Sequence, residues 1–237
     1  MLGNGSNTLF KDSGYHGTVV KLGESFDEVR VHENKVLAGG GALLSVVARA
    51  ALNAGLTGFE FASGIPGSTG GAIFMNAGAY GGEMKECLVS TDYITPQGEF
   101  GTFTKDELNL GYRTSVFTDK NYIITSCTLS LKEDKKDIIK EKMDELLGRR
   151  KSKQPLEYPS AGSTFKRPEG AFAGTLIESC GLKGYTIGGA CVSEKHAGFI
   201  VNKGGATFED IDSIIKEVQK KVKDETGYFL ATEVIRI

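Results

Sequence analysis

Apolar residues recur at helical spacing in three parts of the chain. One stripe lies within residues 43–51 and is followed by Gly55, a residue type that commonly ends helices in the left-handed conformation. A second lies within residues 135–151, a highly charged segment with a basic last turn. The third follows Thr207, a favourable N-cap, and stops at Gly227. These stripes predict three amphipathic helices.

Alternation of apolar and polar residues predicts β-strands elsewhere. Residues 88–95 and 99–104 form two such runs, joined by a Pro-Gln-Gly sequence typical of a tight turn. Further runs cover residues 122–131 and the end of the chain, residues 229–237. Helices and strands do not follow the regular β–α–β order of a doubly wound sheet, so the sequence predicts an α+β fold.

The last predicted strand carries one acidic residue among apolar neighbours. Strict alternation places Glu233 on the same face as Ala231, Ile235 and Ile237. Desolvation there would raise the pKa of the carboxyl, which could then donate a hydrogen bond near neutral pH. A rim position, with the carboxylate paired to Arg236 or a lysine, is the alternative that the sequence leaves open.

Residues 64–83, GIPGSTGGAIFMNAGAYGGE, contain too few large side chains to build a core of their own. Glycine adopts backbone conformations that other residues avoid and lets main-chain N–H groups approach a ligand closely. A second glycine loop, GNGSN, occupies residues 3–7. Together the two loops predict a clamp for a diphosphate, whereas the short loop alone is equally typical of an ordinary turn.

Charge and composition exclude several classes of function. Lys and Arg number 28 against 30 Asp and Glu, so the chain lacks the basic field that nucleic-acid binding requires. It contains no GxxxxGK[ST] loop, no GxGxxG between strand and helix, and no GxSxG elbow. The four cysteines form no CxxC pair, which favours buried reduced thiols over a metal site. No apolar run approaches the roughly 20 residues of a membrane span, and the first residues lack the order of a signal peptide, so we expect a cytoplasmic protein.

Pro155, directly after Gln154, ends the charged segment and marks the predicted domain boundary. We therefore expect one domain over residues 1–153 and a second over residues 154–237, with the last strand able to pack back on the first domain. Single polar residues in the loops, such as Ser163 after a glycine or Arg113 after Tyr112, are not diagnostic by themselves.

Six segments in one order resemble a known family. They are GNGSN, residues 64–83, YRTSVF from Tyr112, PSAGSTFKRP from Pro159, HAGFIVN from His196 and TEV from Thr232. In this combination, over nearly the whole chain, the sequence resembles the UDP-N-acetylenolpyruvoylglucosamine reductases, in particular the branch with the shorter substrate domain.

The resemblance implies a fold and a reaction. The fold is an α+β flavoprotein with a vanillyl-alcohol-oxidase-type (PCMH-type) FAD-binding domain, followed by a smaller α+β domain that binds a UDP-sugar. The reaction uses FAD and NADPH to reduce UDP-N-acetylglucosamine enolpyruvate to UDP-N-acetylmuramate for peptidoglycan in the bacterial cytoplasm. We expect these small molecules as partners, with no nucleic acid, membrane insertion or protein partner.

The resemblance also assigns residues. Three fall on the family's catalytic positions: Arg113, Ser163 and Glu233. The residues expected beside the substrate are Tyr112, Lys166 and Lys153. Those expected to bind FAD are Gly3, Asn4, Gly5, Ser6, Asn7, Gly64, Ile65, Pro66, Gly67, Ser68, Gly70, Gly71, Asn76 and Gly78.

The chain begins almost at the GNGSN loop, whereas the family carries a substantial segment before it. We therefore expect an FAD domain that is incomplete at its N-terminus. Two alternatives follow: a non-catalytic UDP-sugar-binding remnant without stable FAD, and a flavin oxidase of the same fold that uses oxygen.

Overall fold

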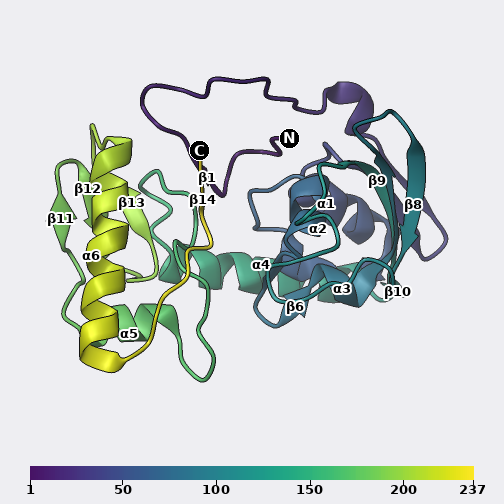
Figure 1. Ribbon diagram of the computed structural model, residues 1–237. Coiled ribbons are helices and arrows are strands. Elements are labelled where there is room, and N and C mark those ends of the chain that lie inside the picture. Colours follow the sequence, from purple (N-terminus) through teal and green to yellow (C-terminus); the bar gives the residue numbers. More distant parts are fainter. The chain divides into compact units, whose positions relative to one another are not determined.

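The structure is a computed structural model that describes residues 1–237, and its contacts divide the chain into two compact units (Figure 1). Unit 1 comprises Met1–Asn4 and Thr18–Arg150, and unit 2 comprises Gly5–Gly17 and Lys151–Ile237. Unlike the predicted domains, these units assign Gly5–Gly17 to the C-terminal part of the chain. The division of function at residue 154 stays a prediction, because contacts define structural units only.

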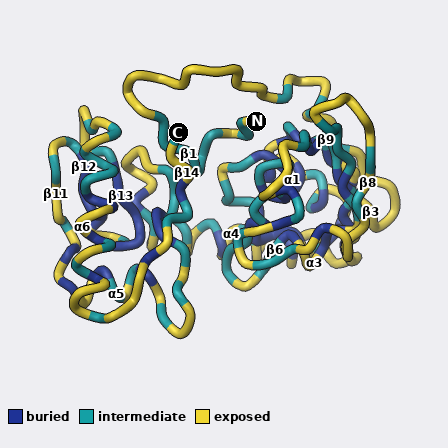
Figure 2. The backbone as a smooth tube through the Cα atoms, in the orientation of Figure 1, coloured by how far each residue is buried: buried dark blue, intermediate teal, exposed yellow.

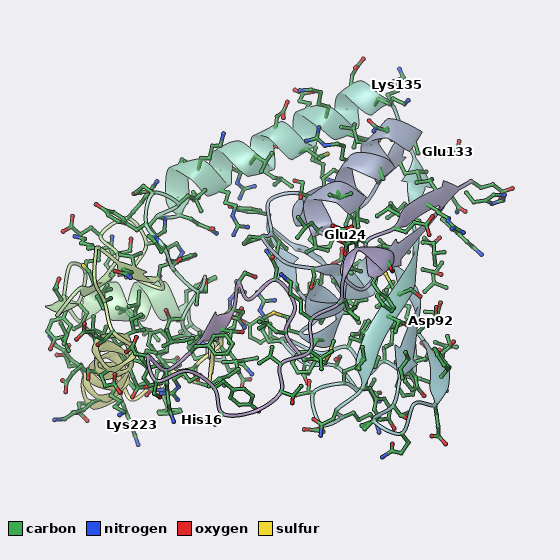
Figure 3. All side chains as sticks on the ribbon, turned by 90° about the horizontal axis from the view of Figure 1, so that it is seen from above. His16, Glu24, Asp92, Glu133, Lys135 and Lys223 are labelled. Atoms are coloured by element: carbon green, nitrogen blue, oxygen red, sulfur yellow. The ribbon has the colours of Figure 1, made fainter.

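Unit 1 is built on a five-stranded antiparallel sheet. Its strand order is β2 (Val29–His32), β3 (Lys35–Gly39), β9 (Ile123–Ser130), β7 (Leu88–Ile94) and β8 (Phe100–Thr104). The strands β7, β8 and β9 confirm the alternating runs of the sequence. Asp92 on β7, labelled in Figure 3, accepts hydrogen bonds from Thr102 at 2.7 Å and Ser126 at 2.6 Å. These bonds join the side chains of three adjacent strands.

Helices cover this sheet and enclose the core of unit 1. They are α1 (Leu44–Ala54), α2 (Thr69–Phe74), α3 (Met84–Cys87) and α4 (Lys136–Lys153), whose last three residues belong to unit 2. The unit also contains the 3-10 turns η1 (Glu24–Phe26) and η2 (Glu60–Ala62) and two strand pairs, β4 (Leu56–Thr57) with β10 (Lys132–Glu133) and β5 (Gly78–Ala79) with β6 (Gly82–Glu83). As predicted, α1 ends at Gly55, whose φ is 73°. It buries Leu44, Val47 and Ala51 in the core that Figure 2 shows in dark blue.

Unit 2 packs one long helix against a small sheet. Its elements are β1 (Thr8–Leu9), α5 (Ala173–Ser179), β11 (Thr186–Ile187), β12 (Ala190–Val192), β13 (Ile200–Asn202), α6 (Phe208–Thr226) and β14 (Ile235–Arg236). As predicted, Thr207 caps α6: its Oγ1 accepts from the Asp210 N–H at 3.1 Å, and Asp210 accepts from the Thr207 N–H at 3.0 Å. Ile214 and Val218 of α6 are fully buried in the core of this unit.

The predicted last strand is wrong in extent and in its buried face. Only Ile235–Arg236 forms a strand, which pairs in parallel with β1 of the same unit. The buried side chains of the segment are Leu230 and Val234, whereas Ile235 is 46% exposed. A short parallel pair leaves most of the segment outside a ladder, so strict alternation does not apply to it.

The cysteines confirm one further expectation, because all four are free and buried. None of the chain's helices combines the length and the apolarity that crossing a lipid bilayer demands.

Glu60 is the one charged residue of the chain that is buried, with only 3% of its surface exposed. Its carboxylate accepts hydrogen bonds from Thr57 Oγ1 at 2.5 Å and Gly58 N at 3.0 Å, and lies 3.5 Å from Lys142 Nζ on α4. Burial by itself would raise the pKa of this carboxyl, but the hydrogen bonds and the lysine charge outweigh it and hold the pKa below its usual value. The ionised group therefore links α4 to the turn that precedes the glycine-rich segment.

We expect Glu60→Gln to lower the free energy of unfolding by about 1–3 kcal/mol at neutral pH, because the amide cannot replace the ionised acceptor. The pKa is depressed in the folded state, so the stabilisation is present above the unfolded value of about 4.3 and is lost as the pH falls through the folded value. Urea titrations at several pH values measure the difference. Exposed Glu133→Gln is the control, and equal stability of wild type and Glu60→Gln at neutral pH would contradict the prediction.

Candidate active site

Within unit 1, the first two residues of the GNGSN loop contact the predicted diphosphate loop of residues 64–71. Asn4 Nδ2 donates a hydrogen bond to the carbonyl oxygen of Pro66 at 2.8 Å. A Cβ atom added to Gly3 would lie 2.7 Å from Ser68 Oγ and 3.7 Å from the Cα of Gly71. Only glycine at position 3 permits this approach without a shift of its neighbour.

Hydrogen bonds within unit 1 hold the second loop in place but leave some of its backbone N–H groups without a partner. Gly70 N donates to the carbonyl oxygen of Gly40 at 2.8 Å, and Ser68 Oγ caps α2 by accepting from Gly71 N at 3.4 Å. The backbone N–H groups of four predicted cofactor-binding residues make no hydrogen bond within the chain; these are Gly3, Asn4, Gly67 and Ser68. A cradle of close backbone approaches with unused N–H donors fits the diphosphate of FAD.

The remaining residues of the GNGSN loop belong to unit 2. Asn7 Nδ2 donates to the carbonyl oxygen of Glu233 at 3.0 Å, and Ile235 N donates to the carbonyl oxygen of Asn7 at the same distance. Ser6 is near the Ser163 loop, because a Cβ on Gly162 would lie 3.9 Å from the Ser6 carbonyl oxygen. In this unit the end of a predicted cofactor loop therefore meets two predicted catalytic segments.

Ser163 and Glu233 lie on neighbouring backbone segments of unit 2. Ser163 pairs with Phe199 in an isolated antiparallel bridge, and Glu233 N donates to the carbonyl oxygen of Thr164 at 2.8 Å. Both residues are half-buried. Arg236, which the sequence offered as a partner of Glu233, instead pairs with Asp212 at 2.6 Å.

Lys166 and Lys153, both predicted beside the substrate, have different environments in unit 2. Lys166 is half-buried, and its N–H donates to the carbonyl oxygen of Ala231, two residues before Glu233, at 2.8 Å. Lys153 is exposed at the last position of α4. Main-chain pairing thus places Lys166, but not Lys153, beside the segment that carries Glu233.

Arg113 occupies a tight turn of unit 1, in which Gly111 and Thr114 form an isolated antiparallel bridge. Its φ of 54° is unusual for a residue with a side chain. Arg113 Nη2 donates to the carbonyl oxygen of Gly78 at 3.4 Å, and the guanidinium carbon lies 5.1 Å from the ring centre of Tyr112. The turn therefore connects a predicted catalytic residue to a predicted cofactor-binding one.

Glu83 adds a negative charge to this region. The Lys85 ammonium, 2.9 Å from Glu83 Oε2, is the main reason why the pKa of the Glu83 carboxyl lies below its usual range. Partial burial opposes the shift, whereas a hydrogen bond from Asn76 and the charge of Arg113 favour it. Glu83 is consequently ionised near neutral pH.

The sequence analysis missed Glu83 and also Ser115, whose Oγ donates to the carbonyl oxygen of Phe74 at 2.7 Å. Ser115 is buried although it follows the Arg113 turn closely. The sequence feature that could have identified Glu83 as a site residue is its position at the end of the glycine-rich segment. Nothing in the hydrophobic pattern marks Ser115 as buried.

Two family models match this chain. Residues 1–104 match a family model described as FAD binding domain, and residues 154–237 match one described as the C-terminal domain of UDP-N-acetylenolpyruvoylglucosamine reductase.

Individual relatives carry the same description. A UDP-N-acetylenolpyruvoylglucosamine reductase of Clostridium perfringens is 54% identical over 234 residues, which cover 99% of this chain and 77% of the relative. One of Agathobacter rectalis is 50% identical over 246 residues, covering 99% and 78%. The crystal structure of the reductase from Thermus caldophilus superimposes with a TM-score of 0.86 at 37% identity, covering 99% of this chain and 84% of that one. The chain therefore belongs to the UDP-N-acetylenolpyruvoylglucosamine reductase family, which consists of FAD-dependent oxidoreductases with an α+β fold and a PCMH-type FAD-binding domain.

Proposed function

We propose that this protein reduces UDP-N-acetylglucosamine enolpyruvate to UDP-N-acetylmuramate, with NADPH as the hydride donor, during peptidoglycan synthesis in the bacterial cytoplasm. The observation that carries the proposal is the likeness of 99% of the chain to reductases named for this substrate, at 54% identity. Arg113 lies in a tight turn, Ser163 forms an isolated bridge with Phe199, and the N–H of Glu233 donates to Thr164; these backbone contacts support the proposal.

The two glycine loops would hold the FAD diphosphate. Their unused N–H groups supply donors without placing a positively charged side chain in the loops themselves. When bound, FAD supplies a site that takes hydride from NADPH and passes it to the terminal carbon of the enolpyruvyl group.

Arg113 would stabilise the negative charge that develops on the substrate. Hydride addition to the terminal carbon moves the electrons of the carbon–carbon double bond to the α-carbon and its carboxylate. A guanidinium is permanently charged and presents a planar fork of donors, so it suits a carboxylate of rising charge.

Ser163 would complete the reduction by giving its hydroxyl proton to the α-carbon, which leaves a saturated lactyl group. A hydroxyl is a weak acid, but an enolate-like carbon is basic enough to take a proton from one that is well placed. Glu233, in its protonated form, would donate a hydrogen bond to the same developing charge. Tyr112, Lys166 and Lys153 would contact the UDP-sugar.

We expect the protein, supplied with FAD, to be yellow and to oxidise NADPH only when UDP-N-acetylglucosamine enolpyruvate is present. Absorbance follows NADPH, and mass spectrometry identifies a product with two more hydrogen atoms. Protein that takes up no FAD but binds the UDP-sugar would instead support a non-catalytic binding protein. Peroxide formation without NADPH would support an oxidase.

We expect Ser163→Ala to slow reoxidation of the reduced flavin by the enolpyruvyl substrate by about 10²–10⁴-fold, because the proton donor is lost. Reduction by NADPH should persist, since that half-reaction needs no proton at the α-carbon. Stopped-flow absorbance separates the two steps. Ser160→Ala, an exposed change in the same loop, is the control, and normal reoxidation in Ser163→Ala would remove Ser163 from this role.

We expect Gly3→Ala to weaken FAD binding by about tenfold, because the new methyl would have to displace the Ser68 hydroxyl from 2.7 Å. Titration of the flavin-free protein with FAD, followed by flavin fluorescence, gives the dissociation constant. Gly148→Ala places a methyl in open space on α4 and should leave that constant unchanged. Equal affinity of Gly3→Ala and wild type would argue against the proposed cradle.

A further inference from the structure

Asn76 is buried, with 1% of its surface exposed, and has a positive φ of 42°. The sequence assigned it to FAD binding, but all of its amide donors and its acceptor are used within unit 1. Its Nδ2 donates to Glu83 Oε2 and to the carbonyl oxygen of Gly111, both at 2.9 Å. Its Oδ1 accepts from the N–H of Lys85 at 3.0 Å. The side chain therefore holds protein segments together.

The bond to Gly111 fixes the first residue of the turn that carries Arg113. The far side of the turn is fixed by Ser115, whose Oγ donates to the carbonyl oxygen of Phe74 at 2.7 Å. Phe74 lies only two positions before Asn76. The Arg113 turn is thus attached at both ends to the short segment 74–76, at the C-terminal end of α2.

The backbone around this attachment is under strain. Of the five residues other than glycine with positive φ, four lie within these loops: Asn76, Tyr80, Asn109 and Arg113. Such conformations cost on the order of 1–3 kcal/mol each and persist only where surrounding contacts determine them. A buried Asn in a turn commonly serves local structure alone. Here, however, the partners at positions 83 and 111 lie 7 and 35 residues away in sequence.

The charge of Glu83 also connects Asn76 to Arg113. The Asn76 amide also orients Glu83, an acidic group whose charge interacts with Arg113. Asn76 therefore touches the backbone that carries Arg113 and the carboxylate that faces its positive charge. The Asn76 side chain combines both contacts in its own hydrogen bonds.

We propose that Asn76 is a positioning residue for Arg113: its amide fixes the Gly111 carbonyl and Glu83 so that the guanidinium is preset for the charge developing on the substrate. This inference rests on the proposed function, because that function gives Arg113 its role. It assigns Asn76 a contribution to the second half-reaction that contact with FAD would not predict.

The test separates the two half-reactions in Asn76→Ala. We expect reoxidation of the reduced flavin by UDP-N-acetylglucosamine enolpyruvate to slow by about 10–100-fold, as for a misplaced catalytic group. Reduction by NADPH and the FAD dissociation constant should remain close to wild type. Independently of activity, hydrogen–deuterium exchange of the flavin-free protein should accelerate at the amides of residues 111–116.

Three variants make the outcomes distinct. Glu60→Gln is the matched control, because it removes the charge of a buried side chain of unit 1 whose hydrogen bonds and ion pair go to Thr57, Gly58 and Lys142 rather than to the Arg113 turn. Its lower stability should leave reoxidation unchanged, and exchange at residues 111–116 should rise no more than at other buried amides of unit 1. If Asn76→Ala does not fold, Asn76→Asp keeps the acceptor for Lys85 N and loses the donors, and should show the same two effects. Arg113→Ala reports on the proposed function itself.

Normal reoxidation or normal exchange in the folded Asn76 variant, together with slow reoxidation in Arg113→Ala, would overturn the positioning role alone. Normal reoxidation in Arg113→Ala would instead show that the proposed function of Arg113 is wrong. Equal slowing in Glu60→Gln would attribute the effect to lost stability and would also overturn the proposal.

Discussion

The main physical constraint on unit 1 is that residues 64–83 have too little side-chain volume to hold their own shape. Burial of Ala72, Ile73 and Ala77 in the core of unit 1 and hydrogen bonds to neighbouring segments fix the segment instead. Thr69 Oγ1 donates to the carbonyl oxygen of Ala42 at 2.9 Å, and Gly70 N donates to that of Gly40 at 2.8 Å. Further along, the Asn76 amide connects the same segment to positions 83 and 111. A buried polar group that loses its partner costs more free energy than one hydrogen bond contributes on balance. Loss of any one of these bonds is therefore expected to destabilise the segment.

This arrangement explains how one segment can serve both the cofactor and the chemistry. Its first part is rich in glycine, and the backbone N–H groups of Gly67 and Ser68 make no hydrogen bond within the chain, as a clamp for an anion requires. Its later part connects to the turn of Arg113 through the buried Asn76 amide, which donates to the Gly111 carbonyl oxygen, and through the carbonyl oxygens of Phe74 and Gly78, which accept from Ser115 and Arg113. A larger side chain in the first part would hinder the approach of the FAD diphosphate. A substitution in the later part would instead change the placement of the Arg113 guanidinium.

Patterns in the sequence predicted the elements whose stability is local. Thr207 and Gly227 define α6 through their own backbone geometry, and Gly55 ends α1 in the same way. The last strand was wrong because its pairing depends on β1, which is distant in sequence and only two residues long. Motifs identified the site residues, but the attachments at Ser115 and Glu83 arise from tertiary contacts that no periodicity encodes.

The predicted catalytic residues are therefore positioned by two different physical means. In unit 2, main-chain hydrogen bonds fix Glu233, whose N–H donates to Thr164 and whose carbonyl accepts from Asn7. Such bonds are independent of the residue's own side chain. Arg113 has a strained backbone, and two side chains hold its turn from outside. The placement of Arg113 therefore depends on residues 76 and 115 as well as on the arginine itself.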